Sequence, residues 1–258
     1  MTFRHKIKFA SNEASNLDQN EVFFFLNENG KDRKFRFHDY EEIFSRAGLY
    51  EQIFYDRLRC SSPRKVAENL KNALDANQQP ITEMRVMDLG AGNGIMGEVL
   101  RNYGVSRLVG VDIIPEAKDA ADRDRPGVYD EYYVEDFCAL GEEVRTELND
   151  WSIDCLTSVA ALGFDDIPVK AFWEAINFVQ DGGWVAFNIK ETFLDNADNS
   201  GFSRFIRELI FSEYLDIHQL ERYRHRLSID GAPLYYFSLV AQKMAGIPEK
   251  FLLECDIH

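Results

Sequence analysis

One stretch of the chain combines an acid with a run of alternating glycines. Asp88 lies in an apolar run and is followed by Gly90, Gly92 and Gly94, with Ala91 between the first two glycines. Glycine adopts positive φ and lets a ligand approach the backbone closely. The helix expected after Gly94 adds unpaired N–H groups at its N-terminus. The order of strand, glycine turn and helix predicts a ligand-binding loop.

Two more acids follow the next two apolar runs. Asp112 ends Leu108–Val111, where a carboxylate can accept hydrogen bonds from both hydroxyls of a ribose. The alternative role for Asp112 is a helix N-cap, and the two roles are compatible. Ile113 is placed to pack on an adenine face. Asp136 follows Tyr132–Val134, and its alternative is a solvated strand end.

The glycine run fits two patterns. Gly92-Asn-Gly94-Ile-Met-Gly97 spells the G-x-G-x-x-G pattern of dinucleotide-binding proteins. Asp88-x-Gly90-x-Gly92-x-Gly94 resembles motif I of the class I S-adenosylmethionine-dependent methyltransferases. The resemblance extends over about residues 80–242, with the later acids in the order of that family. The sequence therefore favours a methyltransferase, with an NAD(P)-linked oxidoreductase or a catalytically silent methyltransferase-fold partner protein as alternatives.

The resemblance implies S-adenosyl-L-methionine as methyl donor and S-adenosyl-L-homocysteine as product. Asp88 would orient the loop and the amino group of the donor. Asp136 would accept the adenine amino group, and Phe137 would donate its backbone N–H to the ring. Val159, in a segment of small residues, would form part of the floor beneath the methyl group, and Tyr55 would cover the donor.

Signals for the methyl acceptor are weaker. Tyr50 precedes the core and is either a cover for the site or an ordinary core aromatic. In the run Arg222–Arg226, strand alternation places the three arginines on one face and Tyr223 and His225 on the other. Arg224 and His225 are therefore candidates for holding an anionic acceptor, although a charged edge strand explains the run equally well. Three histidines are possible general bases by type: His38, His218 and His225.

Missing motifs and composition limit the acceptor. The Asn/Asp-Pro-Pro-Tyr/Phe motif and the Pro-Cys nucleophile are absent, which disfavours DNA base methylation. The formal net charge of −15 also disfavours a large nucleic-acid footprint. Residues 1–40 carry seven basic and six acidic side chains, so RNA stays open. A small-molecule acceptor is the expectation, and the sequence does not predict the oligomeric state.

Composition also indicates the compartment. No apolar run reaches the roughly 18 residues of a membrane span, and no signal-peptide core follows Met1. The four cysteines form no C-x-x-C pair, so neither a metal site nor a disulfide framework is expected. These features favour a cytoplasmic protein without a membrane partner.

The elements that position these residues begin with a cap. Residues 1–20 are expected to form a loose arm, and residues 21–37 a hairpin around Asn29-Gly30. One or two helices follow within residues 38–56. A helix over residues 63–74 should begin with a capping serine, Ser61 or Ser62, and with Pro63.

From residue 80 onward, strands alternate with helices, which predicts a parallel sheet with helices on both faces. The expected strands are 85–89, 107–111, 131–134, 153–159, 184–189, 220–229 and 234–242, and the expected helices are 96–103, 115–123, 142–148, 169–179 and 202–211. Asp230-Gly231 predicts an antiparallel final hairpin. The predicted fold is α/β, a Rossmann-like doubly wound sheet of seven strands, with a cap domain at residues 1–79 and a donor-binding domain at residues 80–258.

Overall fold

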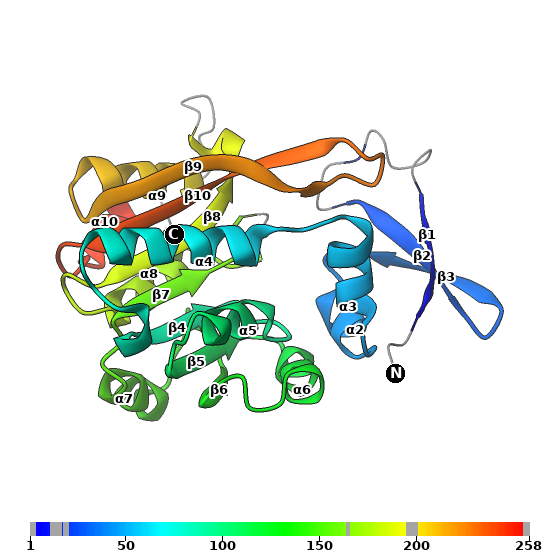
Figure 1. Cartoon of the computed structure of the whole chain (residues 1–258), viewed down its shortest axis with the longest axis horizontal. Coiled ribbons are helices and arrows are strands. Elements are labelled where there is room, and N and C mark those ends of the chain that lie inside the picture. Colours follow the sequence, from blue (N-terminus) through cyan, green and yellow to red (C-terminus); the bar gives the residue numbers. More distant parts are fainter. Residues whose placement is uncertain (1–3, 11–16, 18–20, 164–165, 195–200, 255–258) are drawn as a thin grey trace.

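A seven-stranded mixed sheet forms the centre of the larger part of the protein. The computed structural model describes residues 4–10, 17, 21–163, 166–194 and 201–254 (Figure 1). The sheet order is β6-β5-β4-β7-β8-β10-β9. Its strands are β4 (Arg85–Leu89), β5 (Arg107–Asp112), β6 (Glu131–Val134), β7 (Cys155–Ser158), β8 (Trp184–Lys190), β9 (Leu215–Leu227) and β10 (Pro233–Lys243). β10 is antiparallel to both of its neighbours, which confirms the predicted fold class.

Period-two alternation gives this sheet two buried faces. Val86 packs with one set of helices and Met87 with the other, and Cys155 and Leu156 divide in the same way. One face is covered by α7 (Glu142–Asp150), α8 (Val169–Phe178) and α9 (Gly201–Phe211), and the other by α4 (Ser62–Ala76) and α5 (Ile95–Asn102). Further short elements are η2 (Ile81–Glu83), α6 (Pro115–Asp124), η3 (Glu191–Leu194) and α10 (Lys250–Glu254).

The cap is a small antiparallel sheet with short helices. Its strands are β1 (Lys6–Phe9), β2 (Phe23–Glu28) and β3 (Lys31–Arg36), and its helices are α2 (Tyr40–Phe44), α3 (Leu49–Glu51) and the π-helix η1 (Gln52–Arg57). Asn29 and Gly30 adopt φ of 53° and 81° at the predicted hairpin turn. The expectation of a loose arm is wrong for β1, which pairs with β2. The other arm residues, except 4, 5, 10 and 17, lie outside the described part of the chain.

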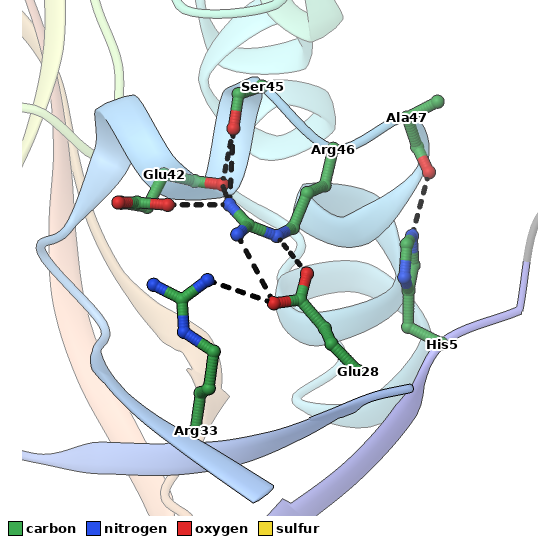
Figure 2. A network of polar contacts seen from close by, with 7 residues as sticks. All are labelled: His5, Glu28, Arg33, Glu42, Ser45, Arg46 and Ala47. Carbon is green, nitrogen blue, oxygen red and sulfur yellow. Dashed lines mark hydrogen bonds and ion pairs between the residues drawn. The ribbon is translucent and has the colours of Figure 1, made fainter. Parts of the chain in front are cut away.

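A network of polar contacts joins the cap's sheet to its helices (Figure 2). Glu28, at the β2–β3 turn, accepts hydrogen bonds from Arg46 Nε at 2.7 Å and from Arg33 Nη1 at 3.1 Å. Arg46 also pairs with Glu42 of α2 at 2.8 Å. Because Arg46 contacts both the turn and α2, it fixes the helices relative to the sheet.

Hydrogen bonds at the glycine loop and at β9 are among the contacts that attach the cap to the larger sheet. At the glycine loop, Glu51 of α3 accepts hydrogen bonds from Asn93 Nδ2 at 2.7 Å and from Arg125 Nη1 at 2.9 Å. At β9, the backbone N–H of Leu227 donates to the Leu58 carbonyl at 2.7 Å. These contacts hold the cap over one end of the sheet (Figure 1).

The N-terminus of α4 lacks the expected capping hydrogen bond from a serine side chain. Ser61 makes no capping hydrogen bond, and its hydroxyl donates to the Arg224 carbonyl of β9 at 2.8 Å. α4 itself packs on the larger sheet through residues such as Val66 and Leu70. The division at residue 79 stays a prediction, with α4 lying against the part of the chain that follows it.

Candidate active site

A cavity of about 310 Å³ lies at the carboxyl ends of β4, β5, β6 and β7. Loops after these strands form its walls, and residues of the cap close it from the opposite side. Ligands bind at this edge of open parallel sheets, because the strand order reverses there and leaves a crevice between neighbouring loops. We call this space the donor cavity.

The glycine loop lies along one wall of the donor cavity. Gly90, Gly92 and Gly94 all have positive φ, at 72°, 53° and 85°. A Cβ at Gly90 would lie 2.7 Å from the Cβ of Ala161, and one at Gly92 would lie 3.2 Å from Phe44. Conformation and space both exclude a side chain at Gly90 and disfavour one at Gly92, and both residues line the cavity. The backbone is left open to a ligand, as the sequence predicts.

Asp88 lies beneath this loop and does not line the cavity. Its side chain is 1% exposed and accepts hydrogen bonds from Thr157 Oγ1 at 2.7 Å and from Tyr129 OH at 2.8 Å. Burial raises the pKa of Asp88 to about 6, although both hydrogen bonds favour the carboxylate. The structure places Asp88 where it supports the loop from below.

Asp112 joins the glycine loop to the end of β5. Its Oδ2 accepts the Gly92 N–H at 2.9 Å, and its Oδ1 accepts the Ile114 N–H at 3.0 Å. Burial raises the pKa of Asp112, and these backbone donors oppose that shift. Each carboxylate oxygen has a second acceptor position, so Asp112 can brace the loop and still bind hydroxyl groups in the cavity that it lines.

The wall of the donor cavity that follows β5 and β6 contains both apolar and acidic side chains. Ile113 is 58% exposed although it is a large apolar side chain. Asp136 has an exposed carboxylate that also accepts the Cys138 N–H at 2.8 Å, and Phe137 is buried beside it. All three line the donor cavity with Val159. An apolar surface next to an acceptor suits a flat heteroaromatic ring with an amino group.

The cap contributes aromatic rings and a histidine–carboxylate pair. Tyr40, Phe44 and Tyr50 line the cavity, and burial raises the pKa of both tyrosines. His38 Nδ1 lies 2.8 Å from Asp166 Oδ1, and both residues line the cavity. Sequence reasoning named His38 only as one of three histidines and did not find Asp166, because a lone acid in a loop carries no pattern.

A smaller space of about 40 Å³ adjoins the donor cavity, and we call it the inner chamber. His38, Tyr40 and Asp166 line both spaces. His225 and Arg226 of β9 line the inner chamber. The inner chamber therefore connects the run of charged residues on β9 to the site that contains the glycine loop.

The prediction that Arg226 shares a strand face with Arg222 and Arg224 is wrong. A β-bulge lies between the pairs Arg226–Leu234 and Arg224–Tyr235, so His225 has no partner in the register. Tyr223 and His225 are both buried, which fits the prediction that they share a face. Arg226 is buried as well, at 9% exposure, while Arg224 is exposed. A bulge turns the following side chain to the other face of a strand, and here it turns Arg226 toward the chamber.

The structure brings most of the predicted site residues together. The donor cavity is lined by Gly90, Gly92, Asp112, Ile113, Asp136, Phe137, Val159 and Tyr50. The residues that line neither space are Asp88, Ala91, Gly94, Tyr55 and Arg224. Ala91 and Gly94 still shape the loop, since the Ala91 N–H donates to Val111 O at 3.0 Å and Gly94 precedes α5. Tyr55 packs in the cap against Tyr50.

Neither a cluster of metal ligands nor a membrane-spanning helix occurs among the residues placed by the structure. No group of three or more potential metal ligands is present in that part of the chain. Likewise, none of the helices formed by the described residues is both long and apolar enough to cross a membrane.

Comparisons with known proteins agree with this geometry. A family model described as "Methyltransferase domain" matches residues 87–187. A search of curated protein sequences found no match. Among solved structures, the N-methyltransferase NodS from Bradyrhizobium japonicum, in complex with S-adenosyl-L-homocysteine, is 13% identical, with a TM-score of 0.53 over 80% of this chain and 97% of that one.

Two archaeal structures are similar to the same degree. A protein of Pyrococcus horikoshii described as a candidate RNA methyltransferase is 15% identical, with a TM-score of 0.51 over 71% of this chain and 84% of that one. A Thermoplasma acidophilum protein is 20% identical, with a TM-score of 0.50 over 69% of this chain and 85% of that one. The family match over residues 87–187 and the strand order together show that the chain has a Rossmann-like methyltransferase fold.

Proposed function

We propose that the protein transfers the methyl group of S-adenosyl-L-methionine to a small-molecule acceptor bound between the donor cavity and the cap. The observation that supports this most directly is the convergence of the glycine loop, Asp112 and Asp136 on one cavity. These groups come from three neighbouring strands, and each matches a different part of the donor.

In this proposal, different residues of the chain bind different parts of the donor. Gly90 and Gly92 leave the backbone open to the amino-acid part, and Asp88 holds the loop in place. Asp112 accepts the two ribose hydroxyls. Ile113 packs on the adenine, and Asp136 accepts its amino group. The positive φ of the glycines and the crowding that a Cβ would cause support this role for the loop.

The bound donor supplies an electrophilic methyl group on a sulfonium. A bond forms between that carbon and the acceptor nucleophile, and the carbon–sulfur bond breaks with its electron pair left on sulfur. The protein's contribution is alignment and exclusion of water. Tyr40, Phe44 and Tyr50 cover the cavity and exclude water from it.

If the acceptor nucleophile carries a proton, a base must remove it. His38 is an imidazole that lines both spaces, and its Nδ1 lies 2.8 Å from a carboxylate oxygen of Asp166. A carboxylate on one ring nitrogen fixes the tautomer and orientation of such a histidine. We therefore propose His38 as the base and Asp166 as its positioning residue.

A small acceptor suits the enclosed site and the charge of the chain. The cap residues leave an inner chamber of about 40 Å³ beside the donor cavity. A net charge of −15 also opposes a large phosphate-backbone footprint. Both observations favour a metabolite over RNA.

Calorimetry with S-adenosyl-L-homocysteine and with NADH tests the donor site. We expect binding of the former only. Asp112→Asn should weaken it by about 10–100-fold, because hydrogen bonds to a charged group contribute about 1.5–3 kcal/mol. Asp119→Asn, at an exposed position on α6, is the matched control and should bind normally. Binding of NADH alone would favour the oxidoreductase alternative.

Methyl transfer itself requires a second measurement. Tritiated S-adenosyl-L-methionine incubated with separate small-metabolite and RNA pools should label the metabolite pool. Tight binding of S-adenosyl-L-homocysteine with no labelling in either pool would indicate a silent methyltransferase-fold partner protein.

A further inference from the structure

The inner chamber contains a buried cation, Arg226, that forms no ion pair with any described residue, although the Asp166 carboxylate lines the same chamber. Arg226 is 9% exposed, and its side chain makes one hydrogen bond, from Nη1 to the Leu227 carbonyl at 3.0 Å. No acid among the described residues forms an ion pair with it. The exposed Arg222 of the same strand, in contrast, pairs with Glu191 at 2.6 Å.

This arrangement is unfavourable unless a ligand completes it. Burying a guanidinium removes hydration that only a partner charge and hydrogen bonds replace. Arg226 retains most of its five N–H donors, in a planar fork that matches a carboxylate. Since Arg226 lines the chamber, those donors are available to a molecule bound there.

His225 adds a second donor to the chamber. Tyr223 OH donates to Ser62 Oγ at 2.7 Å, so the proton of Ser62 is free to donate to His225 Nδ1 at 2.6 Å. Burial, assisted by Arg226, lowers the pKa of His225, so the ring is neutral. A neutral ring that accepts at Nδ1 carries its proton on Nε2, and His225 also lines the chamber.

The same network fixes the chamber relative to the donor cavity. Asn188 Nδ2 donates to Tyr223 OH at 3.0 Å, and Asn188 Oδ1 accepts the N–H of Ala160 at 2.6 Å. Ala160 lines both spaces and has φ of 59°. The series of hydrogen bonds therefore links Ala160, which lines both spaces, to His225, which lines the inner chamber. It fixes the position of the inner chamber relative to the donor cavity.

We propose that the methyl acceptor is a carboxylic acid whose carboxylate binds Arg226 and His225 in the inner chamber. This inference rests on the proposed function and specifies the acceptor class. Two groups of donors converge on a space of about 40 Å³. A water needs roughly 10–15 Å³ of such space, so the chamber holds about three water-sized positions, as many as a carboxylate has heavy atoms. The rest of the acceptor extends toward His38 and the donor.

Acetate provides a direct probe of the chamber. With the full chain saturated with S-adenosyl-L-homocysteine, ¹³C-acetate should show line broadening that ¹³C-acetamide does not show. Arg226→Met should weaken acetate binding at least about 10-fold, as expected for loss of a charge-assisted pair. Arg224→Met removes the exposed neighbouring arginine and is the matched control, expected to bind acetate like the parent protein.

Several results would overturn the proposal. Equal broadening of acetate and acetamide, no broadening by the parent protein, or equal binding by Arg226→Met would each show that the chamber does not recognise carboxylates. Inorganic phosphate broadened in place of acetate would assign the site to a phosphate. The comparison of acetate with acetamide needs no variant, so it holds even if Arg226→Met fails to fold.

Labelling experiments then test whether a carboxylic acid accepts the methyl group. Tritiated methyl groups should enter the metabolite pool, and amidation of its carboxylates beforehand should abolish labelling. Labelling that survives amidation, or that enters RNA, contradicts the carboxylate proposal but leaves the methyltransferase intact. Failure of the protein to bind S-adenosyl-L-homocysteine would instead refute the proposed function, so the two failures are distinguishable.

Discussion

The buried carboxylate of Asp88 should make the stability of the protein depend on pH in a predictable direction. Its folded pKa is about 6, against an ordinary value of 3.8. The folded protein therefore binds this proton more tightly than the unfolded chain does. The contribution to stability is complete below about pH 4 and is lost as the pH rises through about 6.

The size of the effect follows from the shift in pKa. A difference of about two units corresponds to roughly 3 kcal/mol over the full range of pH, at about 1.4 kcal/mol per unit. The group is 1% exposed, so solvent does not screen this value appreciably. Between about pH 7.5 and about pH 5, ionisation of Asp88 alone should change the free energy of unfolding by about 1.4 kcal/mol.

Asp88→Asn removes the titrating group but keeps its shape. Urea unfolding at both pH values gives the change in stability for each protein, and the difference between the two changes isolates Asp88, since the other groups titrate in both. The parent protein should gain about 1.4 kcal/mol more than the variant on acidification. Asp150→Asn, at the exposed end of α7, should behave like the parent protein. Identical pH dependence of Asp88→Asn and the parent protein would refute the argument from burial.

Two further perturbations compare matched positions. Gly90→Ala should destabilise the protein by about 2–5 kcal/mol, because positive φ and a 2.7 Å contact both oppose a Cβ. Gly127→Ala has a similar φ of 74° but open space, so thermal unfolding should show only about 1–2 kcal/mol; equal losses would contradict the contact. Arg46→Met should cost about 1–2 kcal/mol in urea unfolding, since its partly buried side chain makes hydrogen bonds to both Glu28 and Glu42. Arg33→Met breaks an exposed pair with the same acid and should cost less than about 0.5 kcal/mol; a larger loss from Arg33→Met would contradict this ranking.

Local patterns predict the larger sheet well. The bounds of β4 and β6 match the expected ranges of 85–89 and 131–134, and the other strands differ by a few residues at their ends. Buried parallel strands are continuous apolar runs between helices, so the sequence marks them clearly. The positions of Asp112 and Asp136 at the lip of the donor cavity follow from the same rule, because both acids end such runs.

What the sequence does not reveal depends on contacts between distant segments. β1 is four residues long, and only its pairing with β2 distinguishes it from a loop. The bulge at His225 depends on how β9 pairs with β10, so alternation alone puts Arg226 on the wrong face. Asp166 reaches His38 across 128 positions of sequence. None of these depends on a local pattern.

The contact between the cap and β9 has a consequence for synthesis of the protein. Ser61 and Arg224, which join the two parts, are 163 residues apart, and β9 extends from the sheet toward the cap (Figure 1). The ribosome makes the cap before the strand that it contacts. At about 5–20 residues per second, the cap waits roughly 10–30 seconds for that partner. The internal contacts around Glu28 and Arg46 can form during this interval, whereas the chamber that contains Arg226 is completed only after β9 has been made.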